Sequence, residues 1–382
     1  MLLEYCIFIY KKIIGNKKVL FFKIVIFIVI IIFFQTDLMA KPCTKYIMSY
    51  SEAMPLPEFL SADTLQVKDI NYFEFDDLNK VLANSTSGDV ICFKEGVYPP
   101  IIIQDIQDGA HNITLKADDN SHVKINNNDY KGMGIYINNS KNITISGFNL
   151  SGGLYGVYVK GSSNINLINN TIYNVGQEAI IVKSGISKQK LSNFIISNNL
   201  IFDTGKANSQ YGEGIYIGDG NENFNEIIDN VIIDNNYIKN TMNEAIDIKI
   251  NAKHVVINLN TIINTNLKFN GAITVATSDR HGADSDITIS HNIIKGVENR
   301  SGYRPIGIAV GQGNTIITGN IILEDSTKFV GICLYSTFVN SGANTVMLGS
   351  NDIITNGQVF LPNCGNGGSN AFSPANVMRI SE

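Results

Sequence analysis

Three glutamates hold equivalent places in the chain and could share one chemical task. Glu178, Glu213 and Glu244 each come directly before a small residue that opens a short apolar pattern. Carboxylates brought within a few ångströms of one another repel, so such a set needs a counter-charge. Two explanations are open: a bound cation such as Ca²⁺, coordinated by Glu213, Glu244 and Asp247, or neutralisation by lysines.

Lysines stand where they would supply this charge. Lys160, Lys183 and Lys249 each occupy the position just after such an apolar pattern. Lys249 lies five residues after Glu244 and two after Asp247, so carboxylates and an ammonium fall in one short segment. The alternative is a solvated ladder of alternating charges that only joins neighbouring strands.

The outward-facing positions of the same patterns hold several tyrosines. These positions hold Tyr136, Tyr158, Tyr216, Asp247 and Thr274. Aromatic rings lined along one face are suited to stacking on sugar rings, although tyrosine is also a good strand former. Tyr158 and Tyr216, with Lys183, are therefore candidate substrate contacts.

Two insertions lengthen the chain beside these residues, at 183–211 and at 276–306. The second contains Arg280, His281, Arg300 and Arg304. Long loops on a rigid scaffold commonly carry function, and these side chains would place positive charge over an otherwise acidic protein. Arg300 and Arg304 are predicted to contact an anionic substrate, with an irregular surface loop as the alternative.

The elements that must position these residues are short strands in a repeat. A small residue followed by apolar, variable and apolar residues returns at intervals of 22 to 35 residues, from Gly134 to Gly331. Between copies lies an alternating strand that ends in an asparagine, and these asparagines are Asn170, Asn199, Asn236, Asn260, Asn292 and Asn320. Asparagine tolerates the left-handed conformation and its amide can bond the copy above, so these positions predict tight corners and an internal ladder.

The repeat predicts an all-β fold, a single-stranded right-handed parallel β-helix of about 9–10 coils with about three strands each. Leucine-rich repeats would need leucine at fixed positions, and propeller blades a longer and steadier period. The β-helix is expected over residues 89–345. Residues 41–88 would form an N-terminal segment with a capping helix at 75–83, and residues 346–382 a C-terminal cap or tail.

Residues 1–40 predict a signal peptide or a retained N-terminal anchor. Five lysines surround and precede the apolar run Ile24–Phe34, and Ala40 offers a cleavage site. Either outcome exports the domain, so a secreted, periplasmic or cell-surface location is expected, with membrane contact only if the segment is retained. The segment carries a net charge of +3, so its removal changes the net charge of −5 to −8, which argues against nucleic acid as a partner.

Four cysteines follow this segment: Cys43, Cys92, Cys333 and Cys364. An even number in a compartment that permits disulfides allows three pairings. Cys43 with Cys92 and Cys333 with Cys364 would staple the two ends of the solenoid, and free buried thiols are the alternative. The spacing does not suggest zinc.

Three segments carry a resemblance to a known family: Gly212-Glu-Gly-Ile-Tyr-Ile-Gly218, Asn243-Glu-Ala-Ile-Asp-Ile-Lys249 and Arg280-His-Gly282. Over these roughly 70 residues the chain resembles the polysaccharide lyase family of alginate lyases and chondroitinase B, within the pectate-lyase-like superfamily of right-handed β-helices. The resemblance implies an exported lyase that cleaves an acidic, uronic-acid-containing polysaccharide by β-elimination, with Ca²⁺ as cofactor. The alternative function is a non-catalytic surface or adhesive β-helix that binds glycan.

In that family a lysine removes the proton at C5 of a uronic acid, an arginine assists at the leaving oxygen, and acidic residues hold Ca²⁺. The resemblance implies Lys249 as the base, Arg280 or His281 as the acid or charge stabiliser, and Glu244 with Glu213 as metal ligands. A C5–H bond loses its proton only when the adjacent carboxylate is neutralised, so the base and the cation belong together.

Two departures from the family pattern concern this site. Ala276 stands where the family has its arginine, so Arg280 would fill that role only if its loop folds back. Met242 stands two residues before Glu244, where the family has a second acidic ligand.

Overall fold

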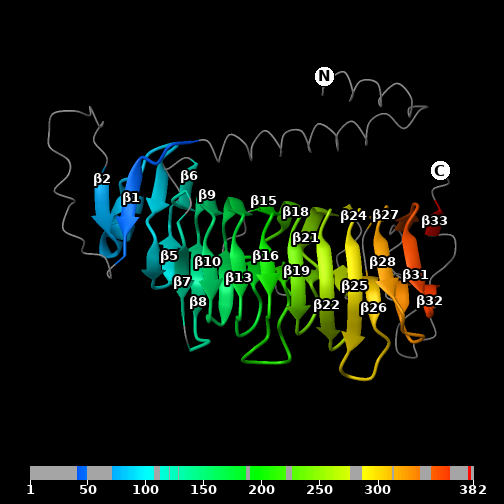
Figure 1. Cartoon of the computed structure of the whole chain (residues 1–382). Helices are drawn as coiled ribbons and strands as arrows, with labels where there is room; N and C mark the ends of the chain where they lie inside the picture. Colours follow the sequence, from blue (N-terminus) through cyan, green and yellow to red (C-terminus); the bar gives the residue numbers. More distant parts are fainter. Residues whose placement is uncertain are drawn as a thin grey trace, which may run out of the picture. The chain divides into compact units, whose positions relative to one another are not determined.

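The repeated apolar patterns form strands that, from residue 90 onward, stack in chain order into three parallel sheets (Figure 1). The structure is a computed structural model, and it describes residues 41–49, 71–106, 112–119, 121–127, 129–185, 190–220, 226–275, 286–311, 314–335, 346–361 and 377–379. The chain divides into two units, Met1–Cys43 and Thr44–Glu382, and the described strands all belong to the second. The predicted signal peptide or anchor at 1–40 lies outside the described residues.

Sheet 1 has thirteen strands among the described residues. In spatial order they are β2 (Asn71–Glu74), β1 (Lys45–Met48), β3 (Val90–Phe93), β6 (Ile113–Ala117), β9 (Lys141–Ser146), β12 (Ser163–Ile168), β15 (Leu191–Ser197), β18 (Ile228–Asp234), β21 (Ala252–Asn258), β24 (Ile287–Ser290), β27 (Thr315–Thr318), β30 (Val346–Leu348) and β33 (Val377–Arg379).

Sheets 2 and 3 have ten described strands each, so ten coils contribute one strand to every sheet. Sheet 2 holds β4 (Gly96–Tyr98), β7 (Val123–Asn126), β10 (Asn149–Ser151), β13 (Thr171–Tyr173), β16 (Leu200–Phe202), β19 (Tyr237–Thr241), β22 (Thr261–Leu267), β25 (Ile293–Asn299), β28 (Ile321–Glu324) and β31 (Asp352–Thr355). Sheet 3 holds β5 (Ile101–Gln104), β8 (Met133–Asn138), β11 (Tyr155–Lys160), β14 (Ile180–Lys183), β17 (Ile215–Ile217), β20 (Ile246–Ile248), β23 (Ile273–Val275), β26 (Ile306–Val310), β29 (Val330–Leu334) and β32 (Gln358–Leu361).

This architecture confirms the predicted parallel β-helix. Alternate side chains of each strand point inward, and the inward isoleucines, valines and leucines form one continuous core. Ile217 and Ile248, for example, are 0% exposed. No coil could bury such a face alone, so stacking of coils is what stabilises the fold.

An internal asparagine ladder joins neighbouring coils, as the sequence predicts. Asn260 donates from Nδ2 to Asn292 Oδ1 at 3.0 Å and to the Ile233 carbonyl at 2.9 Å. The left-handed corner is displaced from its predicted place, because positive φ falls on the residue before the ladder, as at Asn169 (56°) and Leu259 (55°). The ladder side chain turns inward to bond backbone groups, and its neighbour makes the corner.

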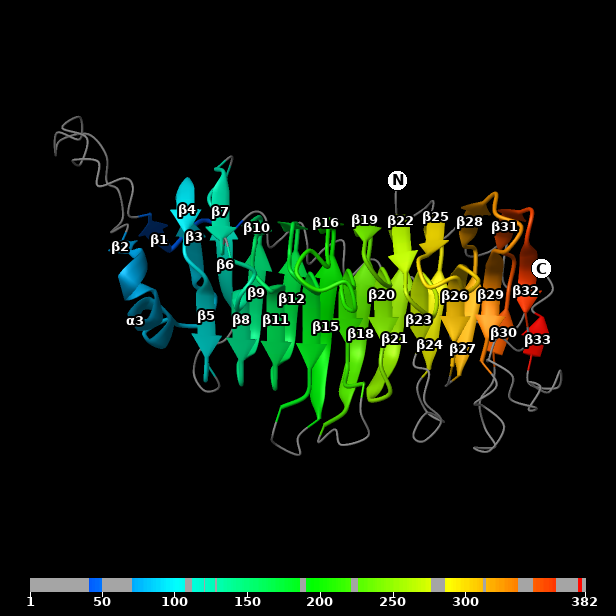
Figure 2. The same ribbon diagram turned by 90° about the horizontal axis from the view of Figure 1, so that it is seen from below.

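The N-terminal end carries the predicted cap. A 3₁₀ turn, η1 (Phe75–Asp77), leads into α3 (Leu78–Ala83), which lies at the β2 end of the stack (Figure 2). The side chains of Leu78, Val81 and Leu82 form the buried face of α3. No helix of the described residues is long and apolar enough to cross a membrane.

The C-terminal boundary differs from the prediction. The sequence placed a cap or tail from residue 346, but β30, β31 and β32 add a further coil to all three sheets, and β33 pairs with β30. In β32 Val359 stands opposite Gly331, so the last coil lacks the small residue by which the earlier copies are recognised. Cys43, Cys92 and Cys333 are disulfide-bonded, and Cys364 lies outside the described residues.

Candidate functional site

One row of side chains runs along the outside of sheet 3, and we call it the outer row. Strand register pairs its members from coil to coil: Ile102, Tyr136, Tyr158, Ile181, Tyr216, Asp247, Thr274, Ala309, Cys333 and Leu361. Their chain neighbours, such as Ile246 and Ile248 beside Asp247, point into the core. The predicted shared face of the tyrosines, Asp247 and Thr274 is therefore present.

Three acidic residues meet over this row, and we call them the acidic cluster: Glu213, Glu244 and Asp247. Each offers a carboxylate oxygen, and these oxygens lie within 4.8 Å of one another. Glu213 and Glu244 come from the turns before β17 and β20, and Asp247 is the middle residue of β20. All three are buried. The sequence singled out these same residues as metal ligands.

Part of the acidic cluster is satisfied by protein donors. Glu213 accepts from the Gly212 amide at 2.9 Å and from Asn243 Nδ2 at 3.2 Å. Glu244 Oε1 accepts from Asn270 Nδ2 at 2.7 Å. Glu244 Oε2 and Asp247 Oδ1 are buried with no hydrogen-bond partner in the described structure. Buried carboxylate oxygens without partners cost free energy, which a cation bound between them would recover.

Burial and mutual repulsion oppose ionisation of these carboxyl groups. Burial raises the pKa of Glu244 well above its usual range, and the charges of Asp247 and Glu213 raise it further. The pKa of Glu213 is raised by burial and by Asp247. Glu178, one coil away, has its pKa raised to about 8 by burial and by Glu213. A site that holds its acids this close favours a positive ligand.

Lys249 is the cation that lies in direct contact with the acidic cluster. Its Nζ lies 2.5 Å from Asp247 Oδ2 and 5.0 Å from the centroid of the Tyr216 ring. Burial acts to lower the pKa of Lys249, but the charges of Asp247, Tyr216 and Glu244 outweigh it and raise the pKa. Lys183 Nζ lies 5.2 Å from the same ring. Tyr216 thus lies close to two ammonium groups, and burial raises the pKa of its hydroxyl.

The donor set suits a hard divalent cation. Carboxylate oxygens and amide carbonyls are the ligands that Ca²⁺ prefers, and Glu213, Glu244 and Asp247 present such oxygens without any thiol or imidazole. The orphaned oxygens of Glu244 and Asp247 are the observation that fits a cation here. Among the described residues, Lys249 and Arg300 place two positive charges beside these three buried carboxylates.

Arg300 bonds to backbone carbonyls, and its contact with an anionic substrate stays a prediction. Its guanidinium donates to the backbone carbonyls of Ser209, Met242 and Asn266, which precede the turns carrying Glu213, Glu244 and Asn270. These bonds tie three successive turns together beside the acidic cluster. An arginine so engaged positions the turns and has few N–H groups left for a substrate.

Arg304 and the remaining predicted residues lie elsewhere. Arg304 Nη1 donates to Gln358 Oε1 of β32 at 2.6 Å, so its side chain faces the last coil and not the acidic cluster. Tyr158 lies two coils before Tyr216 in the outer row, beside Tyr136 and Tyr155. Arg280 and His281, with Ala276, lie outside the described residues.

Sequence reasoning missed the amide donors of the site. Asn243 and Asn270 orient Glu213 and Glu244, and the Tyr335 hydroxyl donates to Asn270 Oδ1 at 3.4 Å. Asn243 directly precedes Glu244, so Asn243 lies within the repeated sequence pattern. Tyr335 is 65 residues beyond Asn270, and no local pattern pointed to it.

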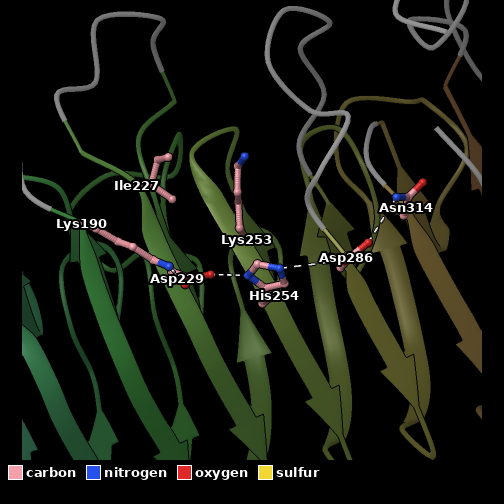
Figure 3. A pocket seen from close by; sticks show the side chains of 7 residues that line it. All are labelled: Lys190, Ile227, Asp229, Lys253, His254, Asp286 and Asn314. Carbon is pink, nitrogen blue, oxygen red and sulfur yellow. Dashed lines mark hydrogen bonds and ion pairs between the residues drawn. The ribbon is translucent and has the colours of Figure 1, made fainter. Parts of the chain in front are cut away.

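A second polar site, a cavity of about 360 Å³, opens where the sheet 1 strands begin (Figure 3). Its lining is Lys190, Ile227, Asp229, Lys253, His254, Asp286 and Asn314. The polar groups pair with one another: Asp229 meets Lys190 and His254, and Asn314 donates to Asp286 at 3.2 Å. Because these charges are already balanced, this cavity makes a weaker case for chemistry than the acidic cluster.

A protein-family comparison agrees with the architecture. The family model described as right-handed β-helix region matches residues 111–322, more than half of the chain. No curated protein matches the sequence.

Several solved structures are similar to the chain. The alginate lyase from Paenibacillus sp. str. FPU-7 matches over 75% of this chain and 95% of its own, with 21% identical residues and a TM-score of 0.58. The surface adhesin PfbA of Streptococcus pneumoniae matches over 74% and 88%, with 12% identity and a TM-score of 0.43. The catalytic unit of the GH87 alpha-1,3-glucanase from Streptomyces thermodiastaticus strain HF3-3 matches over 80% and 64%, with 12% identity and a TM-score of 0.40. At these identities the likeness is one of fold.

Proposed function

Because the chain belongs to the right-handed β-helix family, a scaffold that here carries a compact acidic and cationic site, we propose that it is an exported polysaccharide lyase. Its substrate is a uronic-acid-containing polymer, cleaved by β-elimination. The observation that supports this most is the convergence of Lys249 and Tyr216 on buried carboxylates whose oxygens lack partners. The alginate lyase of similar fold supports the choice of polymer.

The reaction assigned to the site needs a base, a proton donor and charge neutralisation. Lys249 removes the proton from C5 of the uronic acid, the C5–H electrons form the C4–C5 double bond, and the C4–O bond breaks. The leaving oxygen receives a proton from Arg280 or His281, the sequence candidates, or from the Tyr216 hydroxyl, which its raised pKa keeps protonated.

Glu213, Glu244 and Asp247 would hold Ca²⁺ beside Lys249. Bound there, the cation would neutralise the substrate carboxylate and take up the charge of Asp247 that otherwise keeps Lys249 protonated. Tyr158 and Lys183 would contact the sugar chain. Export fits the disulfide-bonded state of Cys43, Cys92 and Cys333, since disulfides persist in oxidising compartments.

The test is the ultraviolet absorbance of the unsaturated uronic end that β-elimination creates. The protein is incubated with alginate, pectate and glycosaminoglycans, with Ca²⁺ and with a chelator. We expect a rise on one polymer that is lost on Lys249→Ala and kept in Lys239→Ala, a matched lysine on β19 of sheet 2. No rise on any polymer from the folded protein would favour the alternative, a non-catalytic glycan-binding β-helix.

A further inference from the structure

Sheet 2 carries two rows of outward side chains that the proposed function does not use. From β13 to β28, strand register pairs the first row as Thr171, Leu200, Tyr237, Thr261, Ile293 and Ile321, and the second row as Tyr173, Phe202, Lys239, Ile263, Lys295 and Leu323. The residue between the two rows points inward on each strand, and Ile238 and Ile294, for example, are 0% exposed. We call the two rows together the sheet 2 face, and Figure 1 shows their strands in order along the stack.

The sheet 2 face is apolar although solvent reaches it. The large apolar side chains of its first row are 37% to 40% exposed, and they are Leu200, Tyr237, Ile293 and Ile321. In the second row the rings of Tyr173 and Phe202 stack, with centroids 5.0 Å apart and planes 10° apart. A contiguous exposed apolar patch on a folded protein commonly marks a binding surface.

The charged side chains of the sheet 2 face are both lysines. Lys239 on β19 and Lys295 on β25 are separated by one strand, so they lie about 10 Å apart along the stack. No ion pair among the described residues includes either ammonium group. The acids at the neighbouring strand ends have partners of their own: Asp203 lies 3.6 Å from the ammonium of Lys206, and Glu324 accepts from a backbone amide at 2.8 Å. The face therefore suits a ligand that combines apolar surface with negative charge.

The shape of the sheet 2 face argues against a second copy of this chain as the ligand. Six strands and two rows make a strip about 25 Å long and about 10 Å wide, roughly 250 Å², whereas a specific protein interface buries about 800 Å² on each partner. A two-fold contact centred on β22 would also set Lys239 of one copy against Lys295 of the other. A single extended polymer chain is narrow enough for such a strip.

A chain of uronic acids has the chemistry and the repeat that the strip requires. Sugar rings present C–H groups on their faces, and these groups pack on aromatic and aliphatic side chains. Coils stack at roughly 4.8 Å, close to the length of one sugar unit in an extended chain. In a chain whose alternate units are turned over, every second carboxylate lies on the same edge, which matches the two-coil spacing of Lys239 and Lys295.

We propose that the sheet 2 face is a second binding site for an acidic polysaccharide, separate from Lys249 and the acidic cluster on sheet 3. One polymer chain lies along the stack, with its sugar faces on the first row and its carboxylates at Lys239 and Lys295. The inference takes its class of polymer from the proposed function, but the two sites are on different sheets and either can fail alone. The second site holds the protein on its polymer and takes no part in the chemistry.

Paired lysine variants test the charge of this site. Retention of the full chain in gels that contain alginate or pectate measures its affinity for the polymer. We expect Lys239→Ala with Lys295→Ala to lower this affinity by about 3- to 10-fold, because each exposed charge contact contributes modestly. Lys141→Ala with Lys328→Ala, on β9 of sheet 1 and in the turn before β29, removes the same net charge and is the control. Equal losses in the two double variants would reduce the effect to long-range attraction and overturn the inference.

A tyrosine variant tests the apolar part of the site. We expect Tyr237→Ala to lower retention by about 2- to 5-fold, since packing on an aromatic ring contributes modestly to binding. Tyr303→Ala, which removes a 46% exposed tyrosine outside sheet 2, should leave retention unchanged. Equal retention of the two variants would contradict a chain lying on the first row.

Cleavage kinetics separate the second site from the lyase site. In the Lys239/Lys295 double variant, KM for long polymer should rise while kcat and KM for the shortest cleaved oligosaccharide stay unchanged. Cleavage with unaltered polymer binding in this variant would overturn the inference and leave the lyase function standing. Polymer binding that the variant loses, without cleavage by the unmodified protein, would keep the inference while the lyase function fails.

Two further measurements identify a different ligand for the same face. Sedimentation of the unmodified protein as a dimer that Ile293→Asp dissociates would assign the face to a second copy. Binding to phosphatidylglycerol vesicles that the Lys239/Lys295 double variant loses, with no retention by either polymer, would assign it to a membrane surface. Either result, or no retention of the unmodified protein by any polymer, would overturn the inference.

Discussion

At the residue scale, the site depends on donors that hold buried carboxylates in place. Asn270 gives Glu244 Oε1 its only described hydrogen bond and receives one from Tyr335. Groups that orient metal ligands typically change metal affinity strongly when removed. The acidic cluster is therefore as much a product of Asn243 and Asn270 as of its carboxylates.

Replacing Asn270 should weaken cation binding without destroying the fold. We expect Asn270→Ala to lower the affinity for Ca²⁺, or for a luminescent lanthanide in its place, by about 10–100-fold. Titration of the cation against the full chain measures this. Asn166→Ala, an amide on β12 that donates to Thr144 Oγ1 at 3.1 Å, is the control and should bind as the unmodified protein does. Unchanged affinity in Asn270→Ala would mean that no cation is held by Glu244.

How far these residues could be predicted depended on how local their pattern was. Two copies of the repeated sequence pattern contain Glu213, Glu244, Asp247 and Lys249. Strand periodicity alone places these residues on one face of the sheet. Arg300 could not be placed, because its guanidinium donates to carbonyls from three other turns. The presence of an arginine in a long loop does not indicate which acceptors its N–H groups will bond.

At the element scale, the ladders determine how coils are joined. Asn260 satisfies buried backbone and side-chain groups on both neighbours, including the Asn236 amide N–H at 3.0 Å. Its removal leaves several of these groups buried and unpaired, and each costs about 1–3 kcal/mol.

Loss of a ladder residue should therefore be among the more costly single changes. We expect Asn260→Ala to lower the free energy of unfolding by about 3 kcal/mol, seen as a lower denaturant midpoint by circular dichroism. The fold should remain, because the other ladder residues still join their coils. Asn84→Ala, at an exposed helix end, is the comparison. Equal midpoints for the two variants would show that the internal ladder does not stabilise the stack.

The charged pairs at the start of the sheet 1 strands predict a dependence on pH. Burial acts to raise the pKa of Asp229, but hydrogen bonds and charge from Lys190 and His254 outweigh it and lower the pKa. A carboxyl whose folded pKa is lowered stabilises the fold above its unfolded pKa of about 4 and loses that contribution as pH falls through the folded value.

We expect Asp229→Asn to melt at a lower temperature than the unmodified protein at neutral pH. This difference should shrink as pH falls below about 4, where Asp229 becomes protonated. Melting curves at several pH values measure it, with Asp352→Asn, an exposed acid on β31, as the control. A difference that stays constant down to the lowest pH would show that the ion pairs do not stabilise this end of the sheet.

The repeat phrases predicted the strands well and their ends less well. The small-apolar-variable-apolar pattern marks β8, β11, β17, β20 and later strands of sheet 3 because alternation is required wherever a strand has one face in the core. The last coil lacks the opening small residue, so the sequence predicts a tail where the structure has β30 to β32. The corners were misplaced by one residue, since asparagine can serve a corner or a ladder equally well.

At the scale of the whole molecule, a solenoid needs protected ends. α3 lies at the N-terminal end of the stack, and its own side chains Leu78, Val81 and Leu82 are buried. This face of the helix shields the core of the first coil from water.

Weakening this cap should destabilise the fold from its end. We expect Leu82→Ala to cost about 2–5 kcal/mol, measured by chemical denaturation, and to increase aggregation by exposing apolar surface and strand edges. Asn79→Ala on the exposed face of the same helix should change neither. Equal stability of the two variants would show that the helix does not protect the first coil.

The outer row connects the fold to the proposed activity. In chain order, sheet 3 presents the half-buried Tyr136 and Tyr158 and then the buried acidic cluster with Lys249 beside it. A single polymer laid along the stack would meet these in sequence.

The chemistry itself is tested by letting the protein cleave the polymer in heavy-oxygen water and measuring the masses of the products by mass spectrometry. β-Elimination adds no water across the broken bond, so we expect products that carry an unsaturated uronic end and are lighter by one water than the products of hydrolysis. Saturated products with heavy oxygen at the new chain end would show hydrolysis and would contradict the lyase assignment of Lys249.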